Sequence, residues 1–155
     1  MKNQKFRLGR TLEGTVFEIA FVVLAILVWV YVTLQLNAAP DTIPTHFGLS
    51  GTPDAYGSKW GMLVPCIMMT VLGGSFLLGA YFPHTLNLPG VAIANMRQAL
   101  LGARMMRILA LLFLLLTAGI AADTMRGSVL YIFVLIGAIL LVGIVFTILI
   151  YRSNG

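Results

Sequence analysis

Long apolar runs alternate with short polar segments along the chain, and this pattern predicts four membrane-spanning helices. A helix needs about 20 consecutive apolar residues to cross the hydrocarbon core of a bilayer. Runs that meet this length cover residues 15–36, 62–82, 99–122 and 129–151. In the third run, the fully apolar part is short, so we expect Arg104 and Arg107 to reach the membrane surface from inside the helix. The expected fold class is an all-α integral membrane protein.

Polar segments divide the chain into a membrane domain, two cytoplasmic parts and a helical hairpin. We expect a basic tail at 1–14, a two-helix membrane domain at 15–82 with an outer loop at 37–60, a cytoplasmic link at 83–98, and a transmembrane hairpin at 99–151. The polar link at 123–128 is short enough to make the last two helices antiparallel. The first span is longer than the apolar region of a cleaved signal peptide, so we expect it to be retained.

Composition excludes the soluble and disordered classes. Hydrophobic residues make up 59% of the chain, charged residues only 10%, and the mean hydropathy is +0.97. A soluble domain carries about 25% charged residues, and a disordered chain combines low hydrophobicity with high charge. The single cysteine, Cys66, excludes an intrachain disulfide.

The distribution of lysine and arginine predicts that both termini are cytoplasmic. Cytoplasmic loops of membrane proteins carry an excess of these residues. The four predicted spans place most of them on one side, namely Lys2, Lys5, Arg7, Arg10, Arg97, Arg104, Arg107 and Arg152. The opposite side receives Lys59 and Arg126. The pI of about 9.8 therefore reflects membrane topology, and we expect no nucleic-acid partner.

Charged residues near the cytoplasmic surface suggest a second functional surface. Arg97, Arg104 and Arg107 fall within about 80° of one another on a helix and are predicted to form a basic stripe. Such a stripe attracts lipid headgroups or docks a cytoplasmic partner. Glu18, inside the first span, is expected to pair with an arginine of the third helix or to reach the surface, whereas Glu13 is expected outside the span.

Small residues predict where the helices approach one another or a second protein. They are Gly73, Gly74, Ser75 and Gly79 in the second helix, Thr117, Ala118, Ala121 and Ala122 in the third, and Gly137, Ala138, Gly143 and Thr147 in the fourth.

The outer loop is the main candidate for functional chemistry. Loops much longer than the usual 4–6 residues are commonly functional. Its prolines and glycines predict a rigid but irregular segment, with a turn at 52–57, "TPDAYG". Ser58 is expected to cap the second helix, in which Pro65 falls early.

The polar side chains of the loop leave several readings open. His46, Asp54 and Lys59 could hold the loop in shape through hydrogen bonds. A zinc site needs three or four ligands, and the loop offers only His46, Asp54 and Asp41, so a metal site would have to be shared between subunits. The loop serines lack the context of a hydrolase nucleophile, and we expect no cofactor.

The loop also carries a recognisable string, Pro44-x-His46-Phe47-x-x-x-Gly51-x-Pro53-Asp54-x-Tyr56-x-Ser58-Lys59. It resembles the signature of a domain of unknown function found in small bacterial membrane proteins, among them the SdpI-like immunity proteins. The resemblance covers residues 15–82, and "LNLPG" at 86–90 is similar to the link that follows in many relatives. It implies a bacterial plasma membrane location. SdpI-like members protect a bacterium from its own secreted toxin and relay the presence of that toxin to a cytoplasmic regulator.

We therefore expect a non-enzymatic inner-membrane protein that recognises a partner through its outer loop, in toxin immunity or sensing or as an accessory subunit. The residues expected to carry recognition are Pro44, His46, Phe47, Gly51, Asp54, Tyr56, Ser58 and Lys59. Besides the lipid bilayer, the expected partners are another membrane protein, a second copy of the chain, or an extracellular peptide toxin. The alternatives are a metal-binding protein or metalloenzyme that uses His46 and Asp54, and a channel or transporter.

Overall fold

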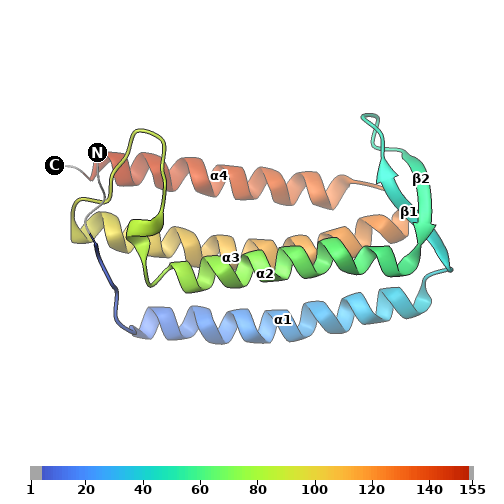
Figure 1. Ribbon diagram of the computed structural model, residues 1–155, viewed down its shortest axis with the longest axis horizontal. Helices are drawn as coiled ribbons and strands as arrows, with labels where there is room; N and C mark the ends of the chain where they lie inside the picture. The colour runs from blue at the N-terminus through green and yellow to red at the C-terminus, as the bar shows by residue number, and fades with distance from the viewer. Residues whose placement is uncertain (1–4, 154–155) are drawn as a thin grey trace.

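The structure, a computed structural model, describes residues 5–153 of the chain. In this range four long helices run side by side, and a β-hairpin projects from one end of the bundle (Figure 1). The helices are α1 (Leu12–Ala38), α2 (Leu63–Gly79), α3 (Met96–Arg126) and α4 (Leu130–Arg152), and the strands are β1 (Thr42–Phe47) and β2 (Pro53–Ser58). Short 3₁₀ turns precede α2 (η1, Lys59–Met62) and follow it (η2, Pro83–Thr85). All four helices are long and apolar enough to cross a membrane.

Local sequence signals set the ends of α1 and α3. The Thr11 hydroxyl accepts a hydrogen bond from the Gly14 amide, so α1 begins earlier than the apolar run suggests and Glu13 lies in its first turn rather than outside the span. Asn95 caps α3 in the same way by accepting from the Gln98 amide. Helix α3 is capped at its C-terminal end by Gly127, whose φ of 61° lies in the left-handed region.

The second helix corrects one prediction and confirms another. Ser58 makes no side-chain capping hydrogen bond, because η1 separates it from the first turn of α2. Pro65 is the third residue of α2, where its missing amide hydrogen has no partner to lose.

Helix α3 forms the centre of the bundle and packs against each of the other three helices. More than half of the most apolar stretch of α3 is buried inside the bundle, whereas none of the corresponding stretch of α4 is buried. Small residues allow this close packing, since a Cβ added at Gly73 would lie 2.9 Å from the Ala110 carbonyl oxygen and one at Gly119 would lie 2.8 Å from Leu135. Gly137 and Gly143 of α4 instead face open space, so these two predicted contact positions do not serve the bundle.

The hairpin corrects the expectation of an all-α chain with an irregular outer loop. Residues 53–57, which were predicted to form a turn, make up most of β2, and the turn itself lies at 48–52. Proline, glycine and two irregularities in register on either side of His46 interrupt the alternation by which a strand is recognised in a sequence.

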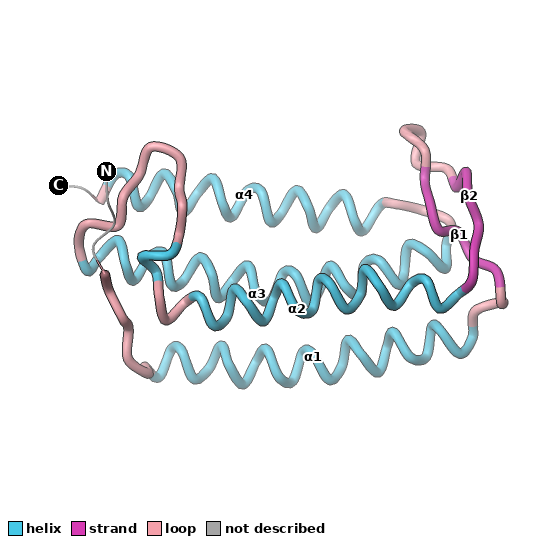
Figure 2. The backbone as a smooth tube through the Cα atoms, viewed as in Figure 1, coloured by secondary structure: helices cyan, strands magenta, loops and turns pink. Residues whose placement is uncertain are grey.

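The two ends of the bundle differ in character (Figure 2). The hairpin and the α3–α4 link occupy one end. The start of α1, the segment between α2 and α3, and the end of α4 lie at the other. Each end therefore offers one candidate functional surface.

Candidate recognition site on the hairpin

Ile43 anchors the hairpin to the bundle. Its side chain is 2% exposed and packs in a cluster with residues of α1, α2 and α3, among them Val32, Cys66 and Ala121. Full burial of an isoleucine side chain contributes about 1.5–3 kcal/mol. The base of the hairpin is thus fixed to the membrane-spanning helices rather than tethered by flexible chain.

The tip of the hairpin is held by its own turn and by the α3–α4 link. The Gly48 amide donates to the Thr52 carbonyl at 2.9 Å, and the Gly51 amide donates to the Gly48 carbonyl at 2.9 Å. Gly51 has a φ of 77°, and an added Cβ there would lie 3.0 Å from Val129. Both the backbone conformation and the close approach explain why glycine stands at this position.

His46 and Asp54 form the one polar pair that joins the two strands through side chains. His46 Nδ1 lies 2.5 Å from an oxygen of Asp54, and both side chains are well exposed. Tyr56, two residues beyond Asp54 on the same strand, is 63% exposed. The hairpin thus exposes an imidazole, a carboxylate and a phenol.

Lys59 has a structural role at the base of the hairpin. Its ammonium group donates to the Ala39 carbonyl at 3.3 Å and lies 3.2 Å from the Asp41 carboxylate, while its amide donates to the Asp41 carbonyl. These contacts join the entry and exit of the hairpin. Pro44 and Phe47, two other residues of the predicted string, are half-buried.

The donor set at the hairpin limits metal chemistry within one chain. In residues 5–153 no three histidine, cysteine or acidic side chains lie close enough together to hold a metal ion. His46 and Asp54 supply two ligands, fewer than the three or four of a zinc site, so a metal at this place would need ligands from a second chain.

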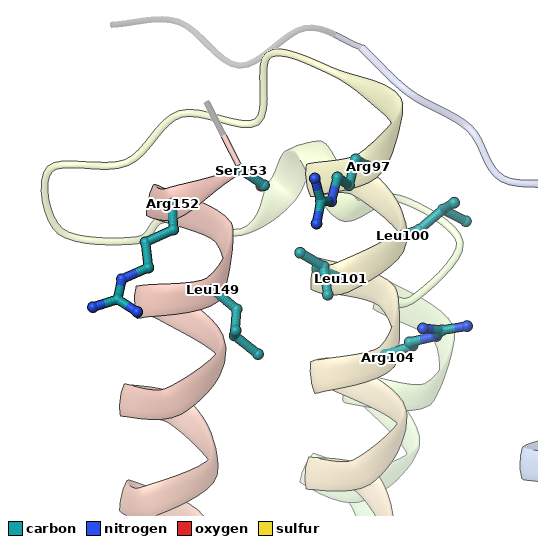
Figure 3. A pocket seen from close by; sticks show the side chains of 7 residues that line it. All are labelled: Arg97, Leu100, Leu101, Arg104, Leu149, Arg152 and Ser153. Atoms are coloured by element: carbon teal, nitrogen blue, oxygen red, sulfur yellow. The ribbon is translucent and has the colours of Figure 1, made fainter. Parts of the chain in front are cut away.

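At the opposite end of the bundle the three arginines of the predicted basic stripe differ in burial and in partners. Arg104 donates to both carboxylate oxygens of Glu13, in a bidentate pair with distances of 2.9 to 3.2 Å. Arg107 is 4% exposed, lies 3.7 Å from Glu13 and approaches α1 so closely that a Cβ added at Gly14 would lie 2.8 Å from its guanidinium group. Arg97 points elsewhere, toward α4 (Figure 3). The prediction of three arginines at the membrane surface is therefore wrong for Arg107, which is buried.

Glu18 has partners other than those predicted. Its carboxylate accepts a hydrogen bond from the Tyr81 hydroxyl, beyond the end of α2, and lies 3.7 Å from Arg10. The ion pair between α1 and α3 is made one turn earlier, by Glu13. Sequence spacing could not distinguish the two acids, because the rotation of α1 about its axis decides which of them faces α3.

The sequence reading missed Asp123, which is fully buried where α3 meets α4. One carboxylate oxygen accepts from the Ile132 amide at 2.9 Å, and the other lies 3.2 Å from the Ser128 hydroxyl. The signal in the sequence is an acidic residue directly after the third apolar run. That run was predicted to end at residue 122, whereas α3 continues to Arg126 and therefore includes Asp123.

Comparison with known proteins supports the resemblance of the N-terminal half. The model of a family described as a domain of unknown function, DUF1648, matches residues 23–70, which run from the middle of α1 through the hairpin into α2. An uncharacterized protein of Archaeoglobus fulgidus is 35% identical over 71 residues, which are 41% of this chain and 39% of that protein. The chain thus spans about two fifths of the length of that relative. No solved structure matches this chain.

Proposed function

We propose that this multi-pass protein recognises a partner outside the membrane through the exposed face of its hairpin, formed by His46, Asp54 and Tyr56. The observation that carries the proposal is the close His46–Asp54 pair, 2.5 Å apart, displayed on a hairpin whose base is buried through Ile43. A fixed hairpin loses little conformational freedom on binding, and a tyrosine offers apolar area with a polar tip.

The proposed setting is a bacterial plasma membrane with both termini in the cytoplasm. The excess of basic residues at the end opposite the hairpin supports this orientation. The proposed role is non-enzymatic, in immunity to or sensing of a peptide toxin, or as an accessory subunit of a membrane complex. The family match over residues 23–70 includes the whole hairpin.

The orientation is tested with cysteine labelling in a Cys66→Ala background. Ser50→Cys places a thiol at the exposed hairpin tip, and Arg10→Cys places one at the opposite end. A membrane-impermeant maleimide should label the first variant in intact cells and the second only after lysis. The reverse pattern would place the hairpin inside the cell.

The recognition role is tested by Tyr56→Ala and by the double variant His46→Ala, Asp54→Ala. Tyr151→Ala is the matched control, because Tyr151 has the same exposed fraction of 63% but lies at the end of α4. Partner recovery by gentle-detergent purification from the native host, and survival on exposure to membrane-active peptide toxins, should fall with both hairpin changes and persist in the control. Hairpin variants that retain both properties would refute the proposal.

A further inference from the structure

A cavity of about 350 Å³ opens between the first turns of α3 and the last turns of α4, at the end of the bundle far from the hairpin. Its walls combine arginine and leucine side chains, namely Arg97, Arg104, Arg152, Leu100, Leu101 and Leu149. Figure 3 shows Arg97 and Leu101 pointing from α3 toward α4, and Leu149 pointing from α4 toward α3. From this geometry we propose that the cavity is a binding site for an anionic glycerophospholipid, independent of the hairpin and its partner.

The charge of the cavity favours an anion. Arg104 is already paired with Glu13, which offsets its charge. Arg97 and Arg152 make no ion pair or side-chain hydrogen bond with any residue between 5 and 153, and both are exposed. Both of these arginines line the cavity, Arg97 with its side chain directed toward α4 and Arg152 with its side chain projecting outward from α4 (Figure 3). Guanidinium groups bind phosphate oxygens through paired N–H donors.

The depth of the lining residues favours a lipid over a soluble anion. Arg97 and Arg152 lie in the terminal turns of α3 and α4. Leu101 lies four residues further into the bundle than Arg97, and Leu149 lies three residues further in than Arg152, which is about 4.5–6 Å deeper at 1.5 Å per residue. A headgroup phosphate at the level of the arginines would place the start of its acyl chains against the leucines. The two zones of the cavity thus match the two zones of one phospholipid.

The surroundings of the cavity suit a lipid that enters from the side. Helix α4 packs against α3, but no residue in its most apolar stretch is buried inside the bundle. Leu100 and Leu149 are both more than two fifths exposed, so the cavity is continuous with a surface that faces hydrocarbon. Acyl chains can therefore leave the cavity along α4 without meeting a polar barrier.

The test measures thermal unfolding of the purified full chain in a mild non-ionic detergent as lipid is added. Phosphatidylglycerol should raise Tm by mass action, and phosphatidylcholine, whose phosphate is balanced by choline, should not. The variant Arg97→Gln, Arg152→Gln should weaken the apparent affinity for phosphatidylglycerol by about tenfold or more. The matched control is Arg7→Gln, Arg10→Gln, which removes the same charge from the same end of the bundle. It should respond as the unaltered chain does.

Three results would overturn the proposal. Equal loss of affinity in both double variants would indicate general attraction between charges. A similar response to phosphatidylcholine would remove the requirement for an anion, and a response to inorganic phosphate alone would identify a soluble ligand. If the variant Arg97→Gln, Arg152→Gln does not fold, Leu149→Trp tests the proposal instead, because the larger side chain fills the cavity while both arginine charges remain. An unchanged response to phosphatidylglycerol in that variant would also refute the lipid site.

Discussion

The carboxylate of Asp123, at the end of α3, accepts a hydrogen bond from the amide of Ile132, in the first turn of α4. A side chain of one helix thereby caps the next helix. In addition, the backbone carbonyl of Asp123 accepts a hydrogen bond from the Ser128 amide. This single buried acid fixes the tight link that brings the two helices together. The link lies against the hairpin tip, so its geometry also bears on the candidate recognition site.

Replacement of Asp123 should destabilise the α3–α4 link. Asp123→Ala leaves the Ile132 amide without its side-chain acceptor, and an unsatisfied buried donor costs about 1–3 kcal/mol. Asp123→Asn keeps an acceptor oxygen and should lie between the alanine variant and the unaltered chain. Thermal unfolding in detergent measures the order. Asp41→Asn is the control, because Asp41 is almost fully exposed; a larger effect there than at Asp123 would contradict the assignment.

Removal of Glu13 should lower stability more than removal of Arg104. Glu13 faces both Arg104 and the buried Arg107, so Glu13→Gln weakens two interactions and leaves the Arg107 guanidinium without this carboxylate. Arg104→Gln removes only the exposed pair, which contributes at most about 1 kcal/mol. Values of Tm for the two single variants give the comparison. Equal losses would mean that Arg107 does not depend on Glu13.

Two neighbouring glycines of α2 should respond oppositely to alanine. A Cβ at Gly73 would lie 2.9 Å from the backbone oxygen of Ala110, so Gly73→Ala forces α2 and α3 apart, at a cost of about 1–3 kcal/mol. At Gly74 nothing lies within 4 Å, and alanine there should be neutral or slightly stabilising because it favours the helix. The pair of Tm values tests the packing of α2, since a shifted or rotated helix would remove the difference.

The hairpin should lose its fixed position when Ile43 is truncated. Ile43→Ala removes a buried side chain from the core cluster, and such changes cost about 2–5 kcal/mol. Limited proteolysis should then cleave within residues 42–58 faster than in the unaltered chain. Leu49→Ala, at the fully exposed tip, should leave the rate unchanged. A hairpin that is equally protected after both changes would not be anchored through Ile43.

The sequence by itself determined the four membrane helices, because their number follows from the length of apolar segments that a bilayer requires. It also predicted a long polar loop at 37–60, and it singled out His46 and Asp54 within that loop. The short polar link predicted the antiparallel packing of α3 and α4. These features depend on composition and local spacing, which a single sequence displays directly.

Only the tertiary structure decided which polar residues meet. Glu13 rather than Glu18 pairs with α3, Arg107 is buried while Arg97 lines a cavity with Arg152, and Asp123 caps α4. Each depends on the rotation and depth of one helix relative to another, and the uniformly apolar helices carry little periodic signal to define that rotation. The hairpin was hidden because its register irregularities interrupt the alternation typical of a strand, and its anchor at Ile43 depends on packing against the bundle.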